Sequence, residues 1–166
     1  GQITALVPYQ VADKSTTSVA VARDGRRTAS VTLRGEASSP AIYTADGSGV
    51  GQAAALNEDG TVNSSENPAA RGTIITLNVT GVGLTVPAGV NGKVAAGAPL
   101  PVAAAPVTVR IGGPRGVGAN AQVRYAGGEA GVVAGVMRIK AVIPPDAPTG
   151  NVPVSFAVGD GPDSVE

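Results

Sequence analysis

The chain has 166 residues, with 12 basic and 12 acidic side chains and a formal net charge of zero, and it lacks both cysteine and histidine. The absence of cysteine excludes disulfides and thiolate chemistry, and the absence of histidine removes the commonest acid–base group and transition-metal ligand. The balanced charge gives no electrostatic footprint for nucleic acid, and no apolar run approaches the roughly 18 residues of a membrane span.

Glycine and proline contribute 24 and 13 residues, and they separate short runs that are rich in Val, Ile and Thr. Such runs, bounded by turn residues, are typical of β-strands, and strands at this spacing predict a β-sandwich. We therefore expect an all-β fold, with an immunoglobulin-like β-sandwich preceded by a partial sandwich of three strands.

The first expected strand, QITALVP at residues 2–8, has a near-copy in RIKAVIP at residues 138–144. Ile3 matches Ile139 and Ala5 matches Ala141, both at an offset of 136 residues. Further along, Val19 and Val21 match Val154 and Phe156, and Ser30-Val31 matches Ser164-Val165. Between the two matched strands of the first copy, Asp24-Gly25 predicts a tight hairpin, because glycine tolerates the positive φ of such turns.

This repeat predicts three regions. Residues 1–35 are expected to be the C-terminal strands of an incomplete immunoglobulin-like unit, residues 36–71 a linker with a β-hairpin, and residues 72–166 an immunoglobulin-like sandwich whose last strand is cut short. Three strands alone expose an apolar face and two edges, so residues 1–35 should pack on something. The residues expected to make this assembly contact are Ile3, Ala5, Val7, Val19, Val21, Val31 and Leu33.

Within the expected sandwich, alternation assigns the buried faces of two strands. In TIITLNVT, Ile75, Leu77 and Val79 fall on the face that we expect to be the core. In VTVRI at residues 107–111, the valines and the isoleucine form one face, and Thr108 and Arg110 the other.

A candidate calcium loop lies in NEDGTVNS at residues 57–64, where Asn57, Asp59 and Asn63 alternate around Gly60 and Glu66 follows. Calcium loops use alternating oxygen ligands, a glycine and a later bidentate acid. Only one strong carboxylate stands among the alternating positions, however, and the twelve-residue EF-hand pattern fails. A hairpin closed by Asp59-Gly60 is the interpretation that we favour.

A glycine-rich run and an arginine cluster are interpreted as a loop and a turn without a bound ligand. The glycine-rich run at residues 112–118 lacks the Gly-Lys-Ser/Thr ending of a phosphate loop, so it is expected to connect strands. The cluster Arg23, Arg26 and Arg27 flanks the first hairpin, where a solvated turn is the default and a contact with an anion or a partner is the alternative.

Two long segments resemble a known family: PAIYTADGSGVGQAAALNEDGTVNSSENPAARGTIITLNVTGVG at residues 40–83, and PVTVRIGG together with AQVRYAGGEAGVVAGVMRIKAVIPPDAPTGNVPVSFAVG within residues 106–159. They are similar to the extracellular repeat domain that is abundant in Solibacter and other Acidobacteria, in which such a block leads into an immunoglobulin-like unit similar to IPT/TIG domains. The resemblance implies a secreted or surface-attached module, often part of a multidomain protein, for which no activity is established.

These observations predict a non-enzymatic structural module without a cofactor, because the usual nucleophiles would lack a histidine base. Its partners are expected to be further copies of itself or adjacent domains of a longer chain. Completion of one subunit's sheet by another subunit's strands would build a filament. The alternatives are an adhesin-like module that binds carbohydrate or protein, which the 2% aromatic content disfavours, an excerpt of a longer polypeptide, or residues 1–35 folding back on residues 72–166.

Overall fold

The computed structural model describes residues 3–113, 118–161 and 164–165. The fold is all-β, and no α-helix occurs among these residues. A 3-10 helix at Tyr9–Val11 precedes the strands, which are β1 (Thr16–Val19), β2 (Ala22–Arg23), β3 (Arg26–Arg27), β4 (Val31–Arg34), β5 (Ala41–Ile42), β6 (Ala55–Leu56), β7 (Ile74–Thr80), β8 (Thr85–Val86), β9 (Val102–Ala103), β10 (Val107–Ile111), β11 (Ala119–Gly127), β12 (Val136–Val142), β13 (Val154–Val158) and β14 (Ser164–Val165).

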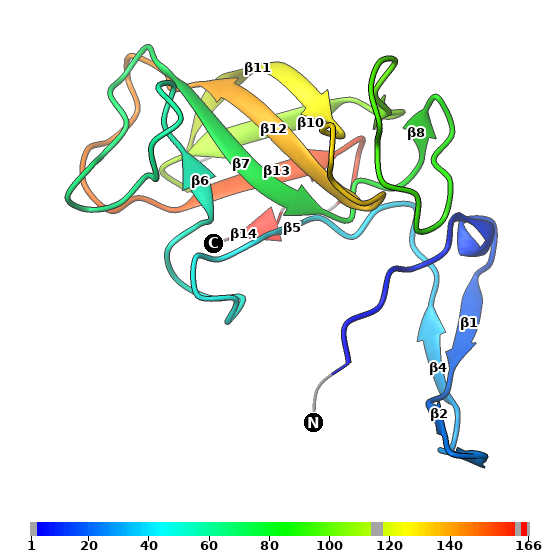
Figure 1. Cartoon of the computed structure of the whole chain (residues 1–166). Coiled ribbons are helices and arrows are strands. Elements are labelled where there is room, and N and C mark those ends of the chain that lie inside the picture. The colour runs from blue at the N-terminus through cyan, green and yellow to red at the C-terminus, as the bar shows by residue number, and fades with distance from the viewer. Residues whose placement is uncertain (1–2, 114–117, 162–163, 166) are drawn as a thin grey trace.

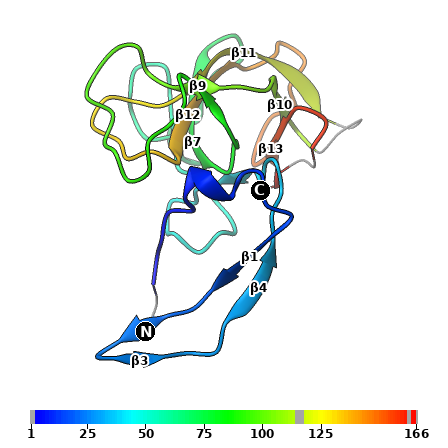
Figure 2. The ribbon, with the colours of Figure 1, turned by 90° about the vertical axis from the view of Figure 1, so that its right-hand side faces the viewer.

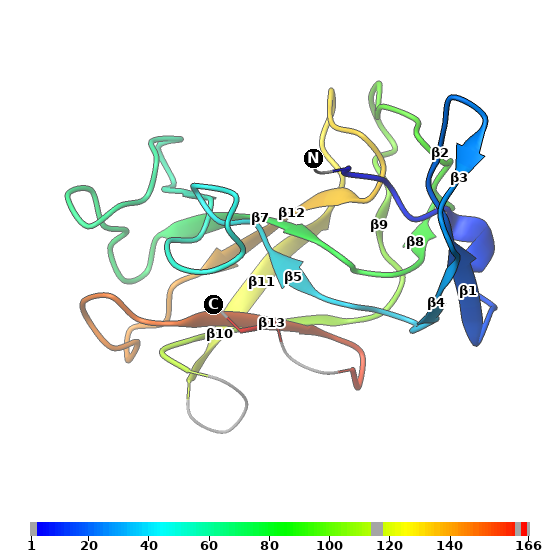
Figure 3. The same cartoon turned by 90° about the horizontal axis from the view of Figure 1, so that it is seen from below.

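The strands from β5 onward form a sandwich in the order β14-β13-β10-β11-β12-β7-β5, with β6 also paired to β7 and β9 paired to β11 and β8. Strand β11 belongs to both layers (Figures 1 and 3). Its first residues pair with β10 and its later residues with β12, and the register shifts between Val123 and Tyr125. Such an irregularity bends a strand, which allows β11 to pass from one layer to the other.

The core lies between these two layers. Leu77, Val79 and Ile139 from one layer meet Val109 and Phe156 from the other, and each of these side chains is at most 1% exposed. The expected buried faces of β7 and β10 are confirmed, with Ile75 and Val107 packed against the core at its margin.

Residues 36–71, expected as a linker with a hairpin, contribute directly to the sandwich. Strands β5 and β6 both pair with β7, and Ile42 and Ala55 are buried in the core. Each strand has two residues, too few to show the alternation by which strands are recognised in a sequence.

Strands β1 to β4 stand apart from the sandwich. Strands β1 and β4 form a two-stranded ribbon that continues into the β2–β3 hairpin, and we call residues 16–34 the N-terminal ribbon. Figures 1 and 2 show it projecting away from both layers. The predicted turn is confirmed at its tip, where Asp24 and Gly25 have φ values of 51° and 75°.

The segment that precedes the ribbon differs from its expected structure. Residues 2–8 were expected to form a strand, but the described residues 3–8 belong to no strand. The matching residues 138–142 lie in β12, hydrogen-bonded between β7 and β11. Residues 3–8 lack such neighbours in the structure, and an unpaired segment gains no ladder of hydrogen bonds.

Candidate functional site

The N-terminal ribbon is amphipathic. Its register places Thr17 opposite Leu33 and Val19 opposite Val31, and these four residues share one face because side chains alternate along each strand. Thr16, Ser18, Thr32 and Arg34 form the other face. The apolar face is uncovered, since Val31 is 60% and Leu33 48% exposed.

The second copy of the repeat shows how the same pattern behaves when it has a partner layer. Val154 and Phe156, which match Val19 and Val21, lie on β13 and pack in the core, where Phe156 is 1% exposed. Strand β13 pairs with β14 in a hairpin, as β1 pairs with β4. Val19 and Val21 of the exposed first copy therefore correspond to core-facing residues of β13. The pairing of the next strand differs, because Val19 lies opposite Val31 in the ribbon whereas Val165, the match of Val31, lies opposite Ser155.

The segment at residues 3–8 repeats this contrast. Ile3 is 68% exposed whereas its match Ile139 is fully buried, and Ala5 is exposed whereas its match Ala141 is fully buried. All of the predicted assembly residues are exposed, namely Ile3, Ala5, Val7, Val19, Val21, Val31 and Leu33. The structure thus leaves them uncovered on two segments, residues 3–8 and the N-terminal ribbon, which lie on either side of the short helix.

The ribbon is attached to the sandwich at the short helix. The Tyr9 amide donates to Oδ1 of Asn91 over 2.8 Å, and the Asn91 amide donates to Oε1 of Gln10. The Tyr9 ring lies against Gly89, where a Cβ would meet the ring. Tyr9 also lines a cavity of about 170 Å³ whose other walls come from residues 85–101 and 128–137. The sequence analysis did not predict this contact between the short helix and the sandwich. Its one signal in the sequence is Tyr9, an aromatic residue in a chain that has few.

The candidate calcium ligands lie on a hairpin whose polar side chains bond to one another. Leu56 and Val62 form a β-bridge across it. Asn63 donates to Oδ1 of Asn57 over 2.9 Å, and Oδ1 of Asp59 accepts hydrogen bonds from both the amide and the hydroxyl of Thr61. These bonds from Thr61 hold the pKa of Asp59 below its ordinary value.

The fourth candidate, Glu66, accepts a hydrogen bond from the Ser65 hydroxyl over 2.8 Å, which lowers its pKa. The structure therefore gives each of the four side chains a partner within the hairpin, in the arrangement of a closed turn. In the described part of the chain, no three residues of the types His, Cys, Asp and Glu gather as a metal-binding group.

A half-buried ionic cluster lies beside the cavity. The Arg138 guanidinium pairs with the Glu129 carboxylate, and the Tyr125 hydroxyl donates to the carbonyl of Gly128 over 2.5 Å. Burial, with a contribution from Glu129, raises the pKa of Tyr125. A carboxylate neutralised by arginine and a phenol held protonated are poor nucleophiles, so this arrangement is suited to fixing residues 128 and 129 onto β11 and β12.

The remaining sequence candidates are placed as follows. Arg23, Arg26 and Arg27 are all exposed at the tip of the ribbon, where the side chains of Arg23 and Asp24 pair at 3.3 Å. In the glycine-rich run, residues 114–117 lie outside the described residues. None of the helices that the structure describes has the length and apolar character to cross a membrane.

Comparisons with models of protein families, with curated proteins and with solved structures return no match for this chain.

Proposed function

We propose that this chain is a non-enzymatic structural module of an extracellular surface, which joins a neighbouring subunit in a filament or multidomain assembly through its N-terminal residues. The observation that carries the proposal is the contrast between the two copies of the repeat. Ile139, Ala141 and Phe156 are buried in the second copy, whereas their matches Ile3, Ala5 and Val21 are exposed in the first.

The energetics favour a partner for this surface. Full burial of a Val, Ile or Leu side chain contributes roughly 1.5–3 kcal/mol, so covering the exposed residues of the first copy would contribute several kcal/mol. Both edges of the ribbon also retain unpaired backbone groups, because β1 and β4 pair only with each other. Such edges are templates for a further strand, and completion by strand addition would satisfy them.

Support for an extracellular location comes from the sequence. Residues 40–83 and 106–159 resemble the acidobacterial extracellular repeat, and the immunoglobulin-like arrangement that we propose for the sandwich is common in surface proteins. A chain without cysteine needs no particular redox environment, which is compatible with this location.

Self-association is tested by light scattering coupled to size-exclusion chromatography over a range of concentrations, with electron microscopy of the concentrated protein. We expect species larger than the 16.1 kDa chain that increase with concentration. The double variant Val31→Asp/Leu33→Asp should remain monomeric because it places charges on the apolar face. The control Thr16→Asp/Thr32→Asp places the same charge on the opposite face and should still associate. A wild-type chain that stays monomeric at every concentration would overturn the proposal.

An adhesin-like function is the second candidate, and the cavity beside Tyr9 favours it. A tyrosine ring in the wall of a cavity of about 170 Å³ could stack on a sugar ring or receive an apolar side chain of a protein. Labelled wild-type protein on a glycan array would bind specific sugars, and Tyr9→Ala would abolish that binding. An array without specific signal would remove the carbohydrate part of this candidate.

A further inference from the structure

The charges of this neutral chain are divided between two regions. The N-terminal ribbon, residues 16–34, carries four basic side chains and one acidic side chain. The next 36 residues, from 35 to 70, carry five acidic side chains and no basic one. Although the formal net charge of the chain is zero, the N-terminal ribbon is positively charged and residues 35–70 are negatively charged.

Each region concentrates its charge at an exposed hairpin. The tip of the ribbon presents Arg23, Arg26 and Arg27, with Asp24 between them. The hairpin at residues 56–67, which we call the acidic hairpin, presents Glu58, Asp59 and Glu66, and all three are exposed. Apolar residues are exposed beside the charges in both regions, since Val21 of the ribbon is 40% and Val62 of the acidic hairpin 64% exposed.

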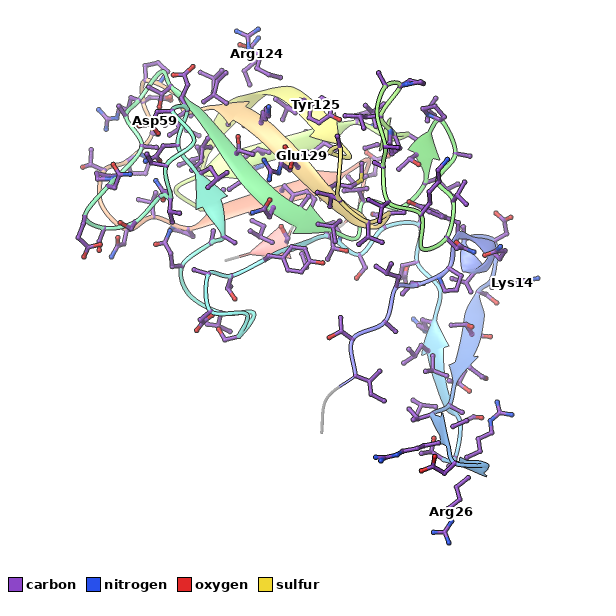
Figure 4. The ribbon with its side chains drawn as sticks, in the orientation of Figure 1. Lys14, Arg26, Asp59, Arg124, Tyr125 and Glu129 are labelled. Atoms are coloured by element: carbon purple, nitrogen blue, oxygen red, sulfur yellow. The ribbon has the colours of Figure 1, made fainter. Side chains whose placement is uncertain are left out.

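The two hairpins lie at opposite ends of the molecule. Figure 4 shows Arg26 at the free end of the ribbon and Asp59 at the far end of the sandwich, and Figure 3 shows the same separation from another direction. The opposite charges therefore do not meet within one chain. They are placed where they can meet between two chains that are arranged head to tail.

We propose that the tip of the N-terminal ribbon of one copy docks on the acidic hairpin of a second copy, with its apolar face laid along that end of the sandwich. This inference rests on the proposed function, for which it names the partner and the receiving surface. The contact is heterologous, because the tip of one copy meets a different surface of the next. Repetition of a heterologous contact gives a ring or an open filament.

The electrostatics of the receiving surface suit this role. The pKa values of Asp59 and Glu66 are lowered by hydrogen bonds from Thr61 and Ser65, so both carboxylates are ionised at neutral pH. Complementary exposed charges accelerate encounter and fix orientation, and salt screens them. The apolar face then contributes the part of the affinity that salt does not weaken.

The test uses two charge-reversed chains. The first is the ribbon variant Arg23→Glu/Arg26→Glu/Arg27→Glu, and the second is the hairpin variant Glu58→Lys/Asp59→Lys/Glu66→Lys. Each alone should associate about ten- to hundred-fold more weakly than the wild type, because three attractive contacts become repulsive. An equimolar mixture should recover association, since the reversed tip of one variant matches the reversed hairpin of the other.

A control chain carries the ribbon variant's change in net charge elsewhere, through Lys93→Glu/Arg124→Glu/Lys140→Glu. All three side chains are exposed and lie outside both hairpins, so this chain should associate like the wild type. Circular dichroism of every variant checks that the sandwich is folded. Sedimentation velocity in about 20 mM and about 500 mM salt measures association, which should weaken at least several-fold at the higher salt.

The outcomes separate the two proposals. Recovery in the mixture, together with weak association of each variant alone, supports the docking. Association that neither variant weakens, or that the mixture does not restore, overturns the docking and leaves self-assembly by another surface. A wild-type chain that is monomeric at both salt concentrations removes the proposed self-assembly itself.

Discussion

The repeat provides a matched pair of substitutions, Ile3→Ala and Ile139→Ala. The two isoleucines occupy the same position in the two copies, but Ile3 is 68% exposed and Ile139 is fully buried. Each substitution removes three side-chain carbons, worth about 0.8 kcal/mol apiece when buried, so Ile139→Ala loses about 2.4 kcal/mol of transfer free energy. The cavity left in the core between the two layers raises the cost to about 3–4 kcal/mol.

Thermal unfolding followed by circular dichroism measures both effects. For a chain of this size, 1 kcal/mol corresponds to about 2–4 °C in Tm, so Ile139→Ala should lower the Tm by roughly 6–16 °C. In dilute monomeric protein, Ile3→Ala should change the Tm by less than about 2 °C, because exposed substitutions stay within about 0.5 kcal/mol. Equal losses for the two variants would show that residues 3–8 are packed in solution, and would refute the reasoning from exposure.

Three further predictions concern the sandwich. Gly81→Ala should destabilise the fold by several kcal/mol more than Gly60→Ala. Both glycines have positive φ, but only at position 81 would the new Cβ meet backbone atoms. Equal midpoints of urea unfolding for the two variants would contradict this. Glu129→Gln should move the pKa of Tyr125 part of the way down towards 10.0 in a spectrophotometric titration, since burial still raises it; an unchanged titration would exclude the contribution of the carboxylate. Calcium at millimolar concentration should leave the Tm unchanged, because the hairpin at residues 57–66 already satisfies its own oxygens; a clear rise would show that the ion displaces those bonds.

Local signals in the sequence predicted the parts of the fold that depend on local chemistry. Alternation identified the buried faces of β7 and β10, and Asp24-Gly25 identified the turn of the ribbon. The residues that the internal repeat singled out are all exposed, on residues 3–8 and on the N-terminal ribbon, and their role in assembly stays a prediction.

Other features depend on contacts that no local pattern reveals. Strands β5 and β6 form because β7 offers them an edge, and two residues carry no periodicity. The contact of Tyr9 with Asn91 joins positions 82 residues apart. Residues 3–8 have the composition of a strand but form none, since a strand requires a neighbour as well as a suitable sequence.

The short pairing of β5 has a mechanical consequence for a subunit under tension. Force applied to the ribbon reaches the sandwich at the contacts of the short helix with Asn91 and, along the chain, at β5. Strand β5 is held to β7 by two residue pairs, whereas β7 is held to β12 by seven. The pairing of β5 with β7 should therefore separate first and lengthen the chain before the pairing of β7 with β12 breaks. Single-molecule pulling from the ribbon should show a small early extension ahead of the main rupture. A single rupture event would show that β5 does not separate from β7 before the rest of the sandwich unfolds.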